Sequence, residues 1–272
     1  MQVTFSVSDA WIDEAFQQMD SWSNSLGAEE ISPGVAFQLL GLLMHGSLSG
    51  PEHFLRNVLE LGRRVAMEGL LQRLVEVAEA RTSPDLLRKI SLLTGSGAKT
   101  RSHGIRITTV DAFSEGFLPP DASRAWKATC RLFERRHQRV GGRRSIGFAL
   151  ASYLVLLTIH PLVDGNGRTA RALFAADCVA NGLGAWPMLS LMLMQQDQNR
   201  LFHLAARCAR QGDFGMLVSC YEQADRQARR YFGACLREMY AREGDDCRQH
   251  SLALELRERL ELMLVGGAGA AI

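Results

Sequence analysis

Apolar residues follow a helical period along most of the chain. Near the N-terminus, Ser8 precedes a stripe of apolar positions three or four residues apart, which predicts a capped helix with one buried side. These positions are Trp11, Ile12, Ala15, Phe16 and Met19. Further helix starts are expected at Ser32-Pro33, Pro51 and Pro84, because proline is favoured in the first turn of a helix. The helix that starts at Pro84 is expected to end near Leu93.

Residues 101–110 break the helical period. β-Branched residues alternate there around Gly104, and Gly95-Ser96-Gly97 precedes them. This pattern predicts a β-hairpin. Pro119-Pro120-Asp121 then ends the loop and starts another helix.

The second half of the chain is predicted to be helical. Residues 146–159 are almost wholly apolar, which is typical of a helix buried on all sides, and helical spacing resumes over 168–181. Further helices are expected at 186–194, 197–211, 214–240 and 251–265. The predicted fold class is mainly α, a helical bundle with one small β-element.

Composition and charge limit the classes of function. Of the 272 residues, 47% are hydrophobic, which is enough for a substantial core in one large domain, or in one domain with a helical appendage. The net charge of +2 is close to neutral and gives no general argument for a nucleic-acid or membrane partner. The histidines show no metal-ligand spacing, so we do not expect zinc.

Cysteine usage and segment lengths bear on location. None of the six cysteines forms a Cys-x-x-Cys pair, which predicts reduced thiols and a reducing compartment. Residues 1–14 lack the basic and then apolar pattern of a signal peptide. Residues 146–159 are fewer than the roughly 20 that cross a bilayer. We therefore expect a cytoplasmic protein without a membrane partner, or an effector delivered without a cleavable signal.

The richest chemistry lies in one stretch, residues 160–171, between two predicted helices. His160 precedes a proline, which disfavours helical backbone, so we expect it at a helix end. Gly165-Asn166-Gly167 falls where the next helix begins and where backbone N–H groups can bind an anion. Arg168 and Arg171 share a helical face and can both reach phosphate oxygens.

Asp164 adds a hard oxygen ligand for a Mg²⁺ ion held mainly by substrate phosphates. His160, with an ordinary pKa of about 6.5, can take a proton from an attacking hydroxyl near neutral pH. Each feature alone is most simply a helix-end histidine, a glycine turn or a solvated arginine. Their coincidence in order and spacing predicts a loop that binds phosphate.

The same stretch resembles the signature of the Fic family: His, any residue, Phe, any residue, Asp or Glu, Gly-Asn-Gly-Arg, two residues, Arg. Every fixed position matches except the Phe, where this chain has Leu162, which can still fill a hydrophobic slot. A Doc-like variant has Ala and Lys at the positions of Gly165 and Gly167 and transfers a phosphate from ATP. The two glycines therefore favour transfer of a nucleotide.

The resemblance implies a protein adenylyltransferase, which moves AMP from ATP to a side-chain hydroxyl of a target protein and releases pyrophosphate. It implies that His160 is the general base, that Asp164 holds Mg²⁺, and that Arg168 and Arg171 neutralise the β- and γ-phosphates. The implied anion cradle consists of the N–H groups of Gly165, Asn166 and Gly167. The target would be modified on Tyr, Thr or Ser, and self-modification is a further expectation.

Fic proteins also carry a β-hairpin flap upstream of the signature, which binds the target segment by strand addition. The predicted hairpin and the double proline after it resemble this flap. The implied flap residues are Ser102, His103, Gly104, Ile105 and Arg106. From the extent of the resemblance we expect a helical extension at 1–50, a Fic-like catalytic domain at 51–224, and a C-terminal helical extension with a flexible tail at 225–272.

Many Fic enzymes are inhibited by a helix with Ser or Thr, three residues, Glu, and then Gly or Asn, whose Glu pairs with the second signature arginine. Glu68 fits in its position and in the glycine that follows, although Arg64 stands where Ser or Thr belongs. Two other places have the spacing but not the following residue, Ser25 with Glu29 and Ser251 with Glu255. We favour Glu68 as the inhibitory residue, and a solvated helix glutamate is the alternative.

Other functions stay open. The chain could be a catalytically idle interaction module with this fold, although intact His160 and Asp164 argue against it, or it could transfer another nucleotide or a phosphate group. Nucleic-acid binding is a weaker alternative that rests on a basic stretch. The stretch contains Arg131, Arg135, Arg136, Arg139, Arg143 and Arg144. A solvated loop is its simpler interpretation, and we do not expect a nucleic-acid partner.

Overall fold

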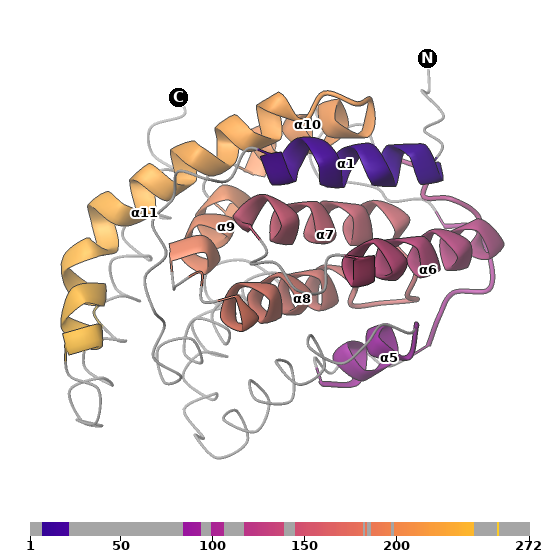
Figure 1. The fold of residues 1–272 in the computed structure, drawn as a ribbon, viewed down its shortest axis with the longest axis horizontal. Coiled ribbons are helices and arrows are strands. Elements are labelled where there is room, and N and C mark those ends of the chain that lie inside the picture. The colour runs from indigo at the N-terminus through magenta and orange to yellow at the C-terminus, as the bar shows by residue number, and fades with distance from the viewer. Residues whose placement is uncertain are drawn as a thin grey trace.

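Helices form the framework of the structure, a computed structural model that describes residues 7–21, 84–93, 99–105, 117–138, 145–181, 183, 186–196, 199–241 and 255. The main helices are α1 (Asp9–Ser21), α5 (Pro84–Leu93), α6 (Ala122–Gln138), α7 (Ile146–Ile159), α8 (Asn166–Ala180), α9 (Trp186–Gln196), α10 (Asn199–Arg210) and α11 (Gly215–Ala241) (Figure 1). The prediction of a mainly helical fold is confirmed.

Helix α7 occupies the centre of the bundle and leads directly into His160. It contacts α8, α1 and α6, and Figure 1 shows it between α1 and α8. Every residue of α7 except Leu157 is buried, which explains why this segment has no polar side. Ser145 caps the helix: its Oγ accepts the N–H of Phe148 at 3.0 Å and donates to Asp20 of α1 at 2.6 Å.

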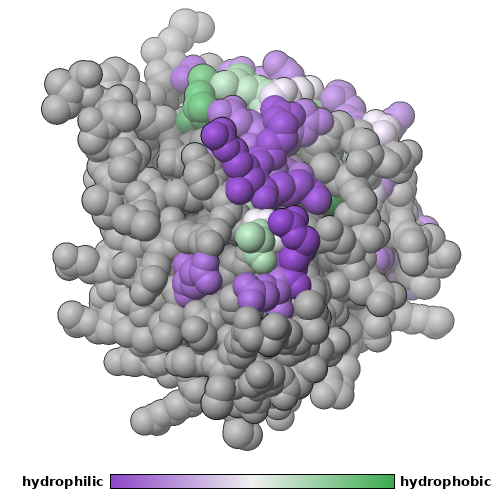
Figure 2. All heavy atoms as spheres, turned by 90° about the vertical axis from the view of Figure 1, so that its left-hand side faces the viewer, coloured by the Kyte–Doolittle hydropathy of each residue, from purple (hydrophilic) through white to green (hydrophobic). Residues whose placement is uncertain are grey.

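Helices α9, α10 and α11 cover one end of the bundle. Helix α11 packs against α9 and α10, and Asp225 of α11 accepts hydrogen bonds from Ser190 of α9 at 2.9 Å and from Arg229 at 2.8 Å. Figure 2, which faces the end of the molecule at the left of Figure 1, shows mostly hydrophilic residues among those drawn in colour. Gln223, Arg226 and Arg230 are among the exposed residues of α11.

Helix α1 crosses α7 at close range. The five apolar positions predicted to form its buried side are all buried, and Ser8 Oγ accepts the N–H of Trp11 at 3.2 Å, as expected for the cap. Gly147 of α7 permits the crossing, because a Cβ at this position would lie 1.7 Å from the carbonyl oxygen of Met19. Trp11 also donates from Nε1 to the carbonyl of Ala209 at 2.9 Å, which joins α1 to α10.

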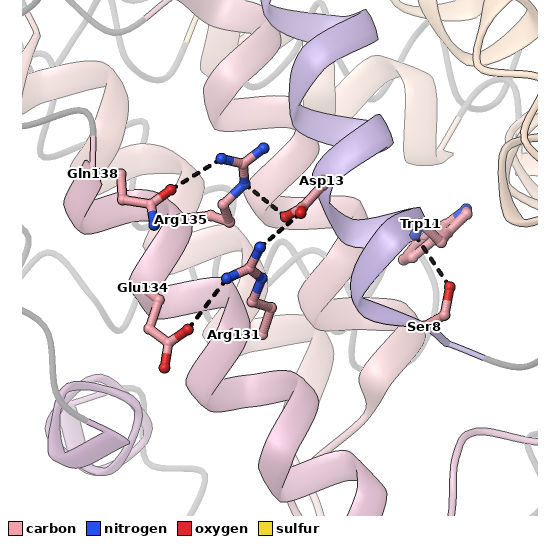
Figure 3. A network of polar contacts seen from close by, with 7 residues as sticks. All are labelled: Ser8, Trp11, Asp13, Arg131, Glu134, Arg135 and Gln138. Atoms are coloured by element: carbon pink, nitrogen blue, oxygen red, sulfur yellow. Dashed lines mark hydrogen bonds and ion pairs between the residues drawn. The ribbon is translucent and has the colours of Figure 1, made fainter.

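The basic stretch contributes to packing between helices. Arg131 and Arg135 of α6 both pair with Asp13 of α1 at 2.6 Å, and Figure 3 shows the two side chains converging on this carboxylate. Arg136 is buried and pairs with Asp177 of α8. The interpretation as a solvated loop is therefore wrong for these three residues, which lie on a helix and pair with distant carboxylates. Its remaining members, Arg139, Arg143 and Arg144, lie outside the described residues.

The expected domain boundaries at residues 50 and 224 stay predictions. Helix α1 packs on α7, and α11 continues across residue 224. The helices expected to start at Ser32-Pro33 and Pro51 lie outside the described residues, as does the one expected at 251–265 except for Glu255, which is helical. No helix in the described part of the chain has the length and apolarity needed to cross a membrane.

Candidate functional site

A short loop from residue 160 to residue 165 joins α7 to α8. His160 is the first residue after α7 and has left-handed backbone angles, φ 51° and ψ 57°, while its N–H donates to the carbonyl of Leu156 at 3.0 Å. The prediction that His160 lies at a helix end is confirmed. A left-handed conformation costs a non-glycine residue roughly 1–2 kcal/mol, so contacts around the loop must hold it in place.

The imidazole of His160 has a defined orientation. Its Nδ1 lies 3.3 Å from the carbonyl oxygen of Leu157. Because a carbonyl oxygen can only accept, this contact places the proton of the neutral ring on Nδ1 and leaves the lone pair on Nε2. Burial lowers the pKa of His160, the Leu157 contact raises it, the charge of Arg101 lowers it, and Asp164 raises it. The net shift is downward and favours the neutral ring.

Asn166, the first residue of α8, fixes the shape of the loop. Its side chain accepts the N–H of Leu162 at 2.8 Å and donates to the carbonyl of the same residue at 2.9 Å. Leu162 is buried in the core, so it fills the hydrophobic slot where the signature has Phe. Gly165 has a φ of 76°, a value that glycine adopts without strain.

Asp164 lies at the exposed tip of the loop. Its side chain is 80% exposed, and Oδ2 lies 3.2 Å from Nη2 of Arg168. Oδ1 accepts the N–H of Gly165 at 2.6 Å. These two contacts orient the carboxylate and leave much of its surface open to solvent, so further ligands can approach it.

The N-terminus of α8 faces the same loop. The first intrahelical bond of α8 runs from the N–H of Thr169 to the carbonyl of Gly165 at 2.9 Å, so the N–H groups of residues 166–168 precede it. Such groups carry the positive end of the helix dipole and form an anion site. The predicted cradle residues Asn166 and Gly167 therefore lie in the first turn of α8, beside Asp164.

The two signature arginines differ in how deeply their side chains are buried. The side chain of Arg168 is 16% exposed, whereas Arg171 is buried, and burial lowers the pKa of Arg171 to about 10. Arg171 still carries its charge at neutral pH. Its Nη1 would lie 3.3 Å from a Cβ added to Gly167, so the guanidinium lies directly beside the first turn of α8.

The predicted flap is described only in its first residues. Thr100 forms an isolated antiparallel bridge with Leu162, so this segment runs beside the loop. Ser102, His103 and Gly104 are exposed and Ile105 is partly buried. Residues 99–105 contain no hairpin, and Arg106 lies outside the described residues. The hairpin is therefore a prediction that the structure does not show.

The predicted inhibitory glutamate, Glu68, lies outside the described residues, as do Ser25 and Glu29. Of the third candidate pair only Glu255 is described, in a helical conformation with partial exposure. The role of Glu68 stays a prediction.

Sequence reasoning missed three residues that adjoin the site. Arg101 donates to the carbonyl of His160 at 2.7 Å. Tyr153 is buried, hydrogen-bonded to Gln195, and close enough to Arg171 for each to affect the pKa of the other. The pattern marked Arg101 only as the start of a hairpin and Tyr153 only as part of an apolar helix, and no local signal singled out Gln195.

Comparisons with known proteins found a family model and solved structures to which the chain is similar. Residues 92–176 match the model of the Fic/DOC family. The chain is similar to a Fic family protein from Desulfovibrio desulfuricans G20, with a TM-score of 0.51 and 17% identity over 84% of this chain and 76% of that chain. A Fic domain containing signaling protein from Bacteroides thetaiotaomicron VPI-5482 gives a TM-score of 0.45 and 13% identity over 95% of this chain and 97% of that chain. No curated protein sequence matches the chain.

The family match spans the central helix, the loop and most of α8, and thus contains His160, Asp164, Arg168 and Arg171. The Desulfovibrio desulfuricans protein shares the fold. Within residues 92–176, the chain is similar to the Fic/DOC family.

Proposed function

We propose that this protein is an adenylyltransferase, which transfers AMP from ATP to a hydroxyl group of a target protein. The observation that supports this most strongly is the loop between α7 and α8. It brings a ring nitrogen able to accept a proton, an exposed carboxylate and a helix N-terminus together within a few residues, in a shape that Asn166 fixes.

The residues present fit a Mg²⁺ ion that enters with the nucleotide. Asp164 offers an exposed carboxylate. The described residues contain no group of three or more His, Cys, Asp or Glu side chains that could hold a metal alone. Mg²⁺ suits such a site, because it commonly takes one or two carboxylates and completes its shell with water and substrate phosphates. When bound, the ion would neutralise charge on the phosphates.

In the proposed reaction, Nε2 of His160 takes the proton of the target hydroxyl. The hydroxyl oxygen bonds to the α-phosphorus, and the bond from that phosphorus to the oxygen bridging to the β-phosphorus breaks. Pyrophosphate leaves with the electron pair, and the proton stays on His160. The N–H groups of the first turn of α8, with Arg168 and Arg171, would stabilise the negative charge of the phosphates.

The departure from the signature at Leu162 is compatible with activity. An idle module would be expected if Leu failed to support the loop, but Leu162 is buried and both its backbone groups bond to Asn166. The proposed target is a protein modified on Tyr, Thr or Ser, or the chain itself. Strand addition along the predicted flap would bind its backbone, which leaves its identity open.

The test is incubation with Mg²⁺ and ATP labelled either on the α- or on the γ-phosphorus. We expect protein-bound label only from the α-phosphorus. His160→Ala should lower the rate at which this label is transferred by roughly 10²- to 10⁴-fold, which is the usual contribution of a general base. His137→Ala is the matched control, because His137 is exposed at the end of α6 and should transfer at the wild-type rate. Label from the γ-phosphorus would change the assignment to phosphotransfer, and undiminished transfer by His160→Ala would overturn the proposed role.

A further inference from the structure

Arg101 is a buried arginine whose guanidinium contacts backbone carbonyls. It is 4% exposed, and Nε donates to the carbonyl of His160 at 2.7 Å. Nη2 donates to the carbonyl of Ile159 at 3.2 Å and to that of Pro120, and Nη1 donates to that of His103 at 3.2 Å. A single side chain thus binds carbonyls of the end of α7, of its own segment and of the turn before α6.

The main chain around Arg101 strengthens this connection. The N–H of Arg101 donates to the carbonyl of Pro161 at 3.1 Å, and the N–H of Val163 donates to the carbonyl of Lys99 at 3.0 Å. With the bridge between Thr100 and Leu162, these bonds hold residues 99–101 along the loop that contains His160. The guanidinium of Arg101 also bonds to the carbonyl of Ile159, the last residue of α7, and to that of His160.

The contacts of Arg101 stabilise the C-terminal end of α7, which is otherwise unfavourable in two respects. The last carbonyls of a helix have no intrahelical donor, and His160 also has a costly left-handed backbone. A guanidinium can satisfy two adjacent carbonyls at fixed geometry, and its positive charge is favourable at a helix C-terminus. Lysine could supply the charge but not the planar fork.

We propose that Arg101 is a positioning residue for His160, which holds the carbonyls of Ile159 and His160 and so fixes the backbone that presents the imidazole to the reacting hydroxyl. The inference rests on the proposed role of His160 as the base. It assigns Arg101 no contact with substrate. Its effect should therefore fall on the rate of the chemical step and leave nucleotide binding intact.

The first measurement is the split between kcat and KM for Arg101→Met and Arg101→Lys. Arg101→Met should lower kcat by roughly 10²-fold, because a displacement of about 1 Å can cost that much in a reaction that depends on positioning. The KM for ATP should change little in either variant. Arg101→Lys should lower kcat by less than Arg101→Met. Arg226→Met is the matched control, since Arg226 is an exposed arginine on α11, and it should keep the wild-type kcat.

The second measurement does not depend on transfer. His160 is titrated by NMR in wild type and in both variants, with His160→Gln to assign its signal. Among the charged groups described, Arg101 lowers the pKa of His160 and Asp164 raises it. Removal of the Arg101 charge in Arg101→Met should therefore raise the pKa of His160, whereas Arg101→Lys should preserve most of the lowering and change mainly the ring environment.

The outcomes separate this inference from the proposed function. If wild type transfers no adenylate but the environment of the His160 ring changes in Arg101→Lys, which keeps the charge, as well as in Arg101→Met, the proposed function fails and the positioning of His160 by Arg101 stands. If wild type transfers and Arg101→Met retains its kcat, the positioning role is overturned. A rise in KM for ATP with unchanged kcat would also overturn it, because it would place Arg101 in nucleotide binding.

Discussion

Two arginine–aspartate ion pairs, one in the core and one beside the loop, differ in how far their side chains are exposed to solvent. Arg136 and Asp177 join α6 to α8 with side chains 1% and 0% exposed, at 2.5 and 2.7 Å, and Ser152 accepts a further bond from Arg136 at 3.0 Å. Arg168 and Asp164 meet at 3.2 Å with side chains 16% and 80% exposed.

The difference lies in what surrounds each carboxylate. The protein encloses the charge of Asp177, so the pair is costly to break and unavailable to a ligand. Water surrounds much of Asp164, so its pair with Arg168 contributes little to stability but leaves the carboxylate accessible. Burial therefore separates a structural ion pair from one that, in the proposed function, would exchange its partner for a substrate and its metal ion.

The largest effect is expected when the buried ion pair between Arg136 and Asp177 is broken. Asp177→Ala leaves Arg136 charged and buried without its carboxylate, and we expect the free energy of unfolding to fall by about 3–5 kcal/mol. Asp164→Ala removes an exposed partner and should cost at most about 1 kcal/mol. Denaturation with urea, followed by circular dichroism, measures both values.

The double variant Arg136→Leu with Asp177→Leu is the control for volume and charge. Replacement of a buried pair by apolar residues is commonly neutral, so the double variant should recover most of the loss seen for Asp177→Ala. Equal losses of unfolding free energy for Asp177→Ala and Asp164→Ala would contradict the view that burial makes the Arg136–Asp177 pair the more important one for stability.

The second prediction concerns Arg171, the buried arginine of the site. Arg171→Ala should weaken ATP binding by about 1.5–3 kcal/mol, the usual value of a hydrogen bond to a charged group, and should leave AMP binding almost unchanged. Calorimetry with ATP and with AMP measures both affinities. Arg226→Ala, which removes an exposed arginine on α11, is the control and should affect neither. Equal losses for the two nucleotides would show that Arg171 does not bind the outer phosphates.

The third prediction concerns the backbone strain that a residue other than glycine would introduce at position 165. Alanine at a φ of 76° should cost about 1–2 kcal/mol in unfolding free energy, because it places a Cβ in a left-handed conformation. Gly104→Ala is the matched control, since no atom lies within 4 Å of its added Cβ. A surface change of this kind should stay within about 0.5 kcal/mol. A Gly165→Ala protein as stable as wild type would mean that the loop rearranges at no cost.

The features that sequence reasoning predicted are local ones. Helix α7 was predictable because an uninterrupted apolar run is itself the signal, and α1 because its cap and stripe lie within a dozen residues. The residues of the candidate site could be selected for the same reason, since His160, Asp164 and both arginines lie in one stretch of twelve residues. Their chemistry follows from residue type and spacing, and their roles remain proposals.

The features that it missed depend on tertiary partners. Arg101 is 59 residues from His160, and Arg136 is 41 residues from Asp177, so no periodicity could pair them. Arg136 looked like a solvated charge because its neighbours in sequence are also basic. The importance of Gly147 likewise comes from a distant segment, the backbone of Met19.

The smallest expected effect is a shift in the pH dependence of transfer, which depends on His160. Burial, the main cause, holds the pKa of His160 below its ordinary value of 6.5, so the ring should still accept a proton at a pH where a free histidine is already charged. Transfer should therefore fall as pH falls, with the midpoint of the acid limb of kcat/KM, which reports the pKa of the free enzyme, below 6.5. Between the folded-state pKa and 6.5 the unfolded chain binds more protons, so the same residue should also reduce stability as pH falls through that window. The difference in unfolding free energy between wild type and His160→Gln, measured from about pH 7.5 to about pH 5, isolates this contribution. If that difference does not vary with pH, or if the acid limb has its midpoint above 6.5, then His160 is not held in its neutral form by burial.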